Sequence, residues 1–252
     1  MLPKTLPIKY ITYRILTEMK VQFRITKLGL FWKIFPSILI ALIVSAFYPI
    51  LFTGSITQDL ALYIFWGLIL WQYPANVISE VSQVKSTIRS QRSIGPTKFA
   101  TFPLYFTAKH LPEHILTFVC SIPIVYFLGA SIVQFHIVFL ALCNGVFLVF
   151  LLVYVLSLLS LSSAILEKVI LTILQLLFFA TPIFWPSRIL GEYEYLLSLN
   201  PLYLYLGTIR EPLLAQNLDS YIYYIIIWEL LLIFLIILLQ PVEKRYHEYS
   251  DS

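Results

Sequence analysis

The chain has 252 residues, of which 60% are hydrophobic, 16% aromatic and only 12% charged. Soluble domains carry about a quarter charged residues, so this composition excludes a water-soluble globular domain and predicts an integral membrane protein of the all-α class. The formal net charge is +4, but the basic residues lie beside apolar stretches. Membrane lipid is therefore an expected neighbour of the chain, and nucleic acid is not an expected partner.

The first element in chain order is residues 8–31, which is too charged to span a bilayer. Its apolar and basic residues fall on opposite arcs of a helical wheel, with Val21 and Gln22 as exceptions. This pattern predicts an amphipathic helix in the membrane interface, and residues 8–33 are assigned to it. The alternative is a basic flank without defined structure that only orients the first span.

Six stretches are apolar and long enough to cross a membrane as helices, which takes about 20 residues each. They cover residues 34–52, 60–79, 115–130, 132–161, 169–185 and 221–239. The alternating pattern of a membrane β-barrel is absent. We therefore predict a single transmembrane domain over residues 1–252, with a six-span bundle at 34–239 and a cytoplasmic tail at 240–252.

In this arrangement, every Lys and Arg residue except Arg188 and Arg210 falls on one side of the membrane. Basic residues concentrate on the cytoplasmic side of membrane proteins. Both termini are therefore predicted to be cytoplasmic, which agrees with an even number of spans.

The longest predicted cytoplasmic loop, residues 80–112, contains a short basic helix that should end at Gly95-Pro96. Arg89, Arg92 and Lys98 are its candidates for docking a cytoplasmic partner. The alternative is a basic loop that only holds the orientation of the spans.

The sequence "TPIFWP" at 181–186 ends the fifth predicted span. Pro182 and Pro186 remove backbone donors and should end the helix near the outer surface. Residues 187–220 stay apolar, but prolines and a glycine interrupt them before any piece reaches spanning length. We expect re-entrant half-helices that line or close a pathway; the alternative is an amphipathic loop outside the membrane.

Four motifs in this order resemble one protein family. They are "EMKVQFRITKLGLFWKIFPSI" at 18–38, "LWQYPANVISEVSQ" at 70–83, "TPIFWPSRI" at 181–189 and "LNPLYLYLGTIREPLL" at 199–214. They resemble bacterial ABC exporter permeases of the type-2 class, above all the polysaccharide exporters for O-antigen, capsule and teichoic acid. Pro74, close to Trp71-Gln72 in the second span, departs from the family pattern.

The resemblance implies a homodimer in the bacterial cytoplasmic (inner) membrane that moves lipid-linked polysaccharide through a pathway between its subunits. It also implies an interface helix, a coupling helix within 80–99 and two re-entrant helices within 187–214. The chain has no Gly-x-x-x-x-Gly-Lys-Ser/Thr loop. It is therefore expected to be a transport subunit, not an enzyme and without its own cofactor, with ATP and Mg on two separate ATPase subunits.

The candidate pathway and gate residues lie at the outer ends of spans one and five and in the segment that follows. They are Tyr48, Phe178, Phe179, Phe184, Trp185, Asn200, Pro201 and Arg210. Aromatic rings can stack on sugar rings and give a long glycan a sliding surface. The alternative for the aromatic residues is the ordinary aromatic belt at the membrane interface.

Glu229 is an acidic residue well inside the sixth span, and such residues are functional candidates by default. It could pair with Arg188 or Arg210, stay protonated, or only fix helix packing through a hydrogen bond. His110 and His114 have no third ligand nearby in sequence, so no metal site is expected.

Two other functions stay open at this point. One is a type-2 exporter of drugs or small lipids, whose pathway would need fewer aromatic residues. The other is a membrane-embedded lipid-modifying enzyme that uses Glu229 or the histidines.

Overall fold

The computed structural model describes residues 7–25, 29, 31–54, 57–92, 98–128, 135–162, 164–214 and 219–244. Every regular element in these ranges is a helix, which confirms the all-α prediction. The helices are α1 Pro7–Ile25, α2 Phe31–Thr53, α3 Gln58–Glu80, η1 Val81–Gln83, α4 Val84–Arg92, α5 Thr101–Phe127, α6 Phe135–Ser162, α7 Ala164–Ala180, η2 Ser187–Leu199, α8 Pro201–Leu213 and α9 Asp219–Leu238.

Five helices within the described ranges are long and apolar enough to cross a membrane, so the chain is a multi-pass membrane protein. They are Phe31–Leu51, Gln58–Arg89, Thr101–Phe127, His136–Leu161 and Tyr221–Leu238. The fifth predicted span, 169–185, corresponds to α7, whose apolar part Lys168–Ala180 is shorter than these five.

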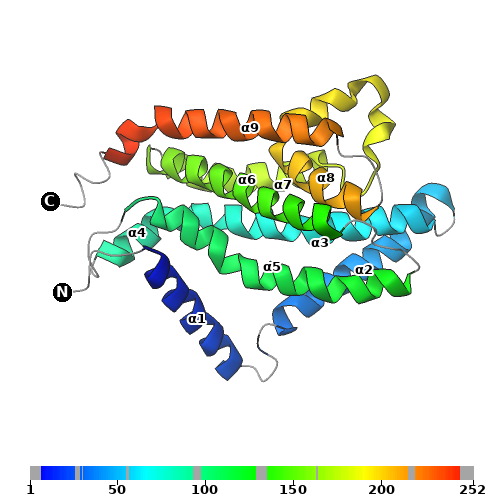
Figure 1. Ribbon diagram of the computed structural model, residues 1–252, viewed down its shortest axis with the longest axis horizontal. Helices are drawn as coiled ribbons and strands as arrows, with labels where there is room; N and C mark the ends of the chain where they lie inside the picture. The colour runs from blue at the N-terminus through cyan, green and yellow to red at the C-terminus, as the bar shows by residue number, and fades with distance from the viewer. Residues whose placement is uncertain are drawn as a thin grey trace.

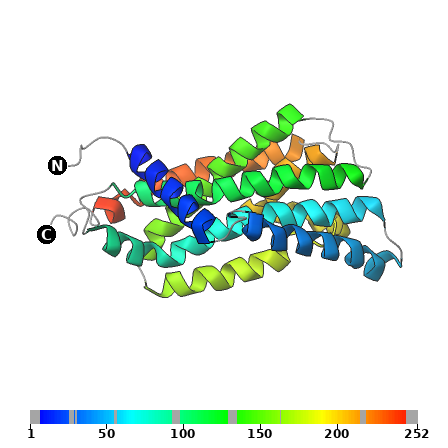
Figure 2. The ribbon, with the colours of Figure 1, turned by 90° about the horizontal axis from the view of Figure 1, so that it is seen from below.

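The long helices run side by side along one axis, while α1 crosses the bundle obliquely (Figures 1 and 2). The start of α1, the end of α9 and the short helix α4 all lie at the same end. The end of α2, the start of α3 and the segment η2 lie at the other end. We call these the α4 end and the η2 end.

Two helix boundaries differ from the sequence-based expectation. α1 ends at Ile25, before the predicted end at 31, and Gly29 then turns the chain with a φ of 50°. α5 begins at Thr101, whereas the third span was predicted from 115. The first part of α5 carries charged residues, and the low hydropathy of this part led to its assignment to a loop. Most of the predicted loop 80–112 is helical in the structure.

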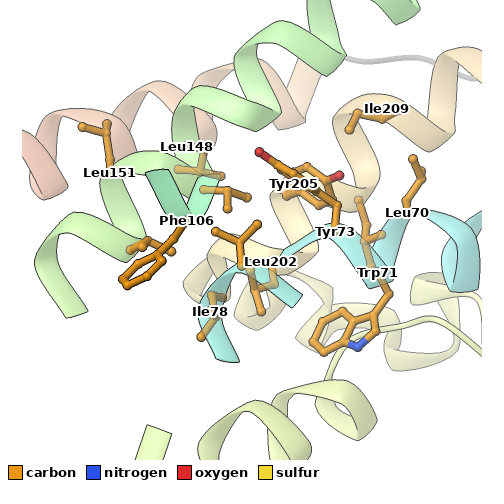
Figure 3. Packing of buried hydrophobic residues seen from close by; sticks show 14 of the residues in the cluster. Leu70, Trp71, Tyr73, Ile78, Phe106, Leu148, Leu151, Leu202, Tyr205 and Ile209 are labelled. Atoms are coloured by element: carbon orange, nitrogen blue, oxygen red, sulfur yellow. The ribbon is translucent and has the colours of Figure 1, made fainter. Parts of the chain in front are cut away.

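The core forms around α3 and α8, which are the most deeply buried helices. Tyr73 of α3 and Tyr205 of α8 meet at its centre, between α5 and α6 (Figure 3). Gly145 of α6 faces the Tyr205 ring, and a Cβ there would lie 2.8 Å from ring carbons. The glycine therefore lets α6 and α8 approach more closely than any other residue would.

Candidate functional site

The helix α7 ends at Ala180, directly before the "TPIFWP" sequence. Pro182 has no backbone N–H and disfavours the helical conformation for Thr181 before it. Thr181 makes the last helical bond, from its backbone N–H to the carbonyl of Leu177 at 2.8 Å, and its hydroxyl donates to the same carbonyl at 2.6 Å. The interruption leaves the carbonyl of Pro182 without a helical donor, and two side chains from elsewhere fill that role.

The carbonyl of Pro182 accepts hydrogen bonds from Arg210 at 2.8 Å and from the Tyr63 hydroxyl at 3.1 Å. The guanidinium of Arg210 lies 3.6 Å from the centroid of the Tyr63 ring, a cation–π contact. Its second nitrogen is 3.4 Å from the carboxylate of Glu211. Arg210 is 0% exposed. One buried arginine thus joins α3, the break after α7, and α8.

Asn200 ties the start of α8 to the same break. Its side-chain oxygen accepts from the backbone N–H of Leu202 at 3.0 Å, and so caps the helix. Its amide nitrogen donates to the hydroxyl of Thr181 at 2.8 Å. Pro201 follows at the first helical position, where its missing donor costs nothing. We refer to Tyr63, Thr181, Pro182, Asn200, Arg210 and Glu211 as the Arg210 cluster.

The outer side of α8 packs against α9. Gly207 allows the ring of Tyr221 to lie where a Cβ would overlap it, and the Tyr221 and Tyr203 hydroxyls share a hydrogen bond of 2.8 Å. Trp228 donates from its indole nitrogen to the carbonyl of Ser198 at the end of η2, at 2.9 Å. The segment between α7 and α9 is therefore fixed on both sides.

Three of the predicted aromatic residues come together near the η2 end. Phe184 lies 5.1 Å from Tyr48 and 5.3 Å from Phe178, measured between ring centroids. Trp71 of α3 extends the group, 5.5 Å from Phe178. Trp71 was not among the predicted pathway residues, because a Trp inside an apolar span gives no sequence signal of its neighbours.

The two remaining predicted aromatic residues lie elsewhere. The ring of Phe179 touches that of Phe178 but is 71% exposed. Trp185 packs against a smaller cluster formed by Leu197, Tyr203 and Leu204. The five predicted aromatic residues thus fall into three parts. Tyr48, Phe178 and Phe184 pack together, Phe179 of α7 faces outward, and Trp185 lies in a separate cluster.

Glu229 pairs with neither of the arginines considered from the sequence. Its carboxylate accepts a hydrogen bond of 2.9 Å from the side-chain amide of Asn144 on α6, and Arg210 is held within its own cluster. Both partners are half-buried in this single chain. Of the alternatives weighed from the sequence, this contact corresponds to a hydrogen bond that fixes helix packing.

The predicted coupling residues lie at the α4 end. Val84 and Ile88 bury one side of α4 against the bundle, while Arg89 is exposed. Lys98 is exposed just before α5. The side chain of Arg92 lies outside the described residues. The helix α4 therefore presents Arg89 to the surroundings of the bundle, as a docking element would.

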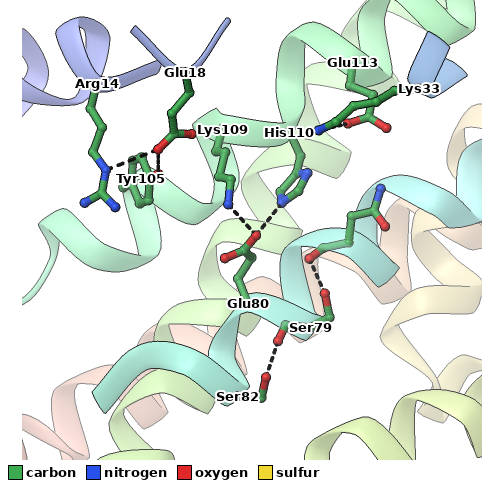
Figure 4. Close-up of polar contacts among 11 residues, drawn as sticks. Arg14, Glu18, Lys33, Ser79, Glu80, Ser82, Tyr105, Lys109, His110 and Glu113 are labelled. Carbon is green, nitrogen blue, oxygen red and sulfur yellow. Dashed lines mark hydrogen bonds and ion pairs between the residues drawn. The ribbon is translucent and has the colours of Figure 1, made fainter. Parts of the chain in front are cut away.

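A second polar cluster, which sequence reasoning missed, joins α1 to α5 and α3 (Figure 4). Glu80 accepts from Lys109 at 2.7 Å and lies 3.1 Å from the Nε2 of His110. One turn earlier, the hydroxyl of Tyr105 donates to Glu18 of α1 at 2.5 Å. The guanidinium of Arg14 lies 4.3 Å from the centroid of the Tyr105 ring. We call these residues, with Lys33 and Glu113, the Glu80 cluster.

Lys33 at the start of α2 and Glu113 of α5 complete this cluster as an ion pair of 3.6 Å. The signal for it was the spacing of polar residues along α5, at positions 105, 109 and 113, which places them on one helical face. Their partners come from three other helices, and so no local pattern could name them.

The two histidines of α5 contact different groups. His110 faces Glu80, whereas His114 stacks on Tyr73, with 4.6 Å between ring centroids, and lies 3.3 Å from the Tyr205 hydroxyl. Within the described residues, no group of three His, Cys, Asp or Glu side chains could hold a metal ion.

Comparison with known proteins does not identify the chain. No protein-family model matches it, and a search of the curated proteins finds no match. The features of the chain that bear on its function are the buried short helix α8, the two polar clusters and the aromatic group.

Proposed function

We propose that this protein is the permease subunit of an ATP-driven exporter of the type-2 ABC class. It moves a lipid-linked polysaccharide of the O-antigen, capsule or teichoic acid kind outward across a bacterial cytoplasmic membrane. The motif resemblance motivates the class. The observation that carries it is α8, a short helix that is nonetheless buried along its length and anchored through Arg210 and Asn200.

A helix of 13 residues is about 20 Å long, whereas crossing the hydrocarbon core takes about 30 Å. Every residue of α8 from Leu202 to Leu213 is buried. In the proposal, α8 and η2 are re-entrant elements that enter the membrane from its outer side. The helix α7 also crosses the membrane, which brings the five long helices to six crossings. Both termini are then cytoplasmic, because α1 starts and α9 ends at the α4 end of the bundle.

The aromatic group supports a glycan substrate. Tyr48, Phe178 and Phe184 come from α2, α7 and the break, and so surround the place where the helix α7 ends. Phe179 presents a further ring outward from the same helix. Two copies of the chain facing each other across this side would line a passage with rings suited to stacking on sugars.

Energy comes from two ATPase subunits that bind ATP and Mg, and the permease receives their motion at the α4 end. Arg89, Arg92 and Lys98 are the proposed docking residues. The Glu80 cluster connects this end to α1, because Glu80 closes α3 immediately before η1 and α4 while its partners Lys109 and His110 lie on α5, which also holds α1.

Deletion of the gene, followed by complementation, tests the proposal. Cells without the chain should lose surface polysaccharide and accumulate lipid-linked polymer inside, with unchanged drug sensitivity. Complementation with Arg89→Glu and Lys98→Glu together should fail although the protein is present in the membrane, and Arg188→Glu at the opposite end should restore export.

Two outcomes would contradict the proposal. Unchanged surface glycan with altered drug sensitivity would indicate an exporter of drugs or small lipids. Turnover of a lipid by the purified chain without any ATPase would indicate a membrane-embedded enzyme that uses Glu229 or the histidines.

A further inference from the structure

A small recess lies where α1 rests against α5 and the start of α2. Five side chains that can carry charge line it: Glu18, Lys33, Lys109, His110 and Glu113. Its empty space is about 350 Å³ when the open solvent at its mouth is counted. The recess thus combines two carboxylates with two ammonium groups at one place, which is unusual beside a membrane span.

Each charged group of the recess has a partner: Lys109 and His110 contact Glu80, Glu18 contacts Arg14 and Tyr105, and Lys33 contacts Glu113. Lys33 and Glu113 are 3.6 Å apart, which is too long for a hydrogen bond, and their side chains are 48% and 20% exposed. A lysine ammonium has three donors, and a carboxylate has about four acceptor sites. Both residues therefore keep hydrogen-bonding capacity for a ligand that carries both charges.

The position of the recess fits the depth of a lipid headgroup. Ile15 and Met19 of α1 form part of its wall, while Leu16 and Val21 leave apolar side chains exposed on the same helix. A helix with this pattern lies in the membrane interface. Lys33 stands at the start of α2, whose apolar span begins there. Headgroups of the adjacent leaflet therefore lie level with the recess.

The balance of charges selects among phospholipids. Pockets for anionic lipids are basic, whereas two carboxylates match two ammonium groups among the described lining residues. Outside the recess, Glu80 pairs with Lys109 and Arg14 pairs with Glu18, which keeps this balance. A choline headgroup cannot donate hydrogen bonds and is bound by aromatic cages, and none of the described residues that line the recess is Phe, Tyr or Trp. A headgroup with a phosphate next to a primary ammonium matches both kinds of charge in the recess. Its phosphate would face Lys33 and Lys109, and its ammonium would face Glu18 and Glu113.

We propose that the recess among α1, α2 and α5 binds the headgroup of a zwitterionic phospholipid with a free ammonium group, of the phosphatidylethanolamine type. This site does not depend on the proposed transport function. A bound headgroup would contact both α1 and α5, and would add to the Tyr105–Glu18 hydrogen bond that holds these two helices together.

The test is native mass spectrometry of the purified full-length chain with dioleoyl phosphatidylethanolamine, phosphatidylcholine and phosphatidylglycerol at equal concentration. One retained ethanolamine lipid should exceed each of the other two by about fivefold, the equivalent of one partly exposed charge interaction. Equal retention of all three lipids, or a preference for phosphatidylglycerol, would overturn the proposal.

Two variants test whether the recess causes the preference. Lys33→Gln should abolish it, because the phosphate loses one of its two ammonium partners and the other, Lys109, is held by Glu80. Glu113→Gln should shift it toward phosphatidylglycerol, since the recess then becomes net basic; a purely structural role would not change the order in this way. Lys20→Gln, on the exposed side of α1, is the matched control and should keep the wild-type preference. If a variant fails to fold, the lipid preference of the wild-type chain still tests the proposal.

Discussion

The Arg210 cluster and the Glu80 cluster use the same kinds of groups in different surroundings. Each combines a cation, a carboxylate and a tyrosine whose ring lies against a guanidinium: Arg210 over Tyr63, and Arg14 over Tyr105. The side chain of Arg210 is 0% exposed, whereas those of Arg14 and Lys109 are 31% and 30% exposed. Removal of one partner should therefore be costly in the first cluster and mild in the second.

The largest expected effect comes from Arg210→Ala. It leaves Glu211 buried without its cation and the carbonyl of Pro182 with one donor fewer. A broken buried pair costs about 3–5 kcal/mol, so the free energy of unfolding, measured by thermal or SDS titration of the purified protein, should fall by that amount.

Two further variants show whether burial explains this loss. Arg188→Ala, an exposed arginine near the same break, should change stability little. Arg210→Met combined with Glu211→Gln should recover part of the loss, because no unpaired charge then remains buried. A loss for Arg210→Ala no larger than that for Arg188→Ala would show that the Arg210 cluster is not a stabilising contact.

Asn200→Ala should rank second. It removes both the cap on the Leu202 N–H and the bond to Thr181. Loss of a helix cap costs about 0.5–2 kcal/mol. Asn200→Ser should restore the cap alone and recover the corresponding part of the stability, and hydrogen exchange of the first turn of α8 would report this directly. If the serine variant is as unstable as the alanine variant, the contact with Thr181 outweighs the cap.

Glu80→Gln should cost less, about 1 kcal/mol, because partly exposed ion pairs are screened by solvent. The sharper difference is in salt dependence. The loss should shrink at 1 M NaCl, since salt weakens accessible pairs, while the loss for Arg210→Ala should not change. Equal salt dependence of the two variants would contradict the contrast between the clusters.

The contrast also explains which parts of the molecule the sequence revealed. Composition and span length predicted a helical membrane protein, because hydropathy is local and additive along the chain. The end of α7 was predictable for the same reason: Pro182 acts on its immediate neighbours. The sequence named Arg210 as a candidate but not its partner Tyr63, which lies far away in sequence on α3.

The Glu80 cluster was hidden for a different reason. Residues such as Lys109 and Glu113 lowered the hydropathy of the stretch before 115, so it was assigned to a loop. In the structure, these residues continue α5 because other helices supply opposite charges: Glu80 from α3 and Lys33 from α2. A helix stabilised by partners far away in sequence cannot be recognised from its own composition.

The smallest effect, and the most specific one, concerns the contact that holds α1 on the bundle. Tyr105→Phe removes only the hydroxyl that donates to Glu18, and the ring stays in place below Arg14. One such hydrogen bond contributes about 0.5–1.5 kcal/mol, which is too little to unfold the bundle but enough to loosen α1. Hydrogen exchange should therefore quicken in α1 and remain unchanged in α8.

Tyr126→Phe is the matched control, on the same helix but with a side chain that is 74% exposed. It should leave exchange in α1 unchanged. Should Tyr105→Phe also leave it unchanged, the Ile11 and Ile15 packing of α1 against the core would be the stronger attachment. The Glu80 cluster would then orient α1 without holding it, and its contrast with the Arg210 cluster would be one of role as well as of burial.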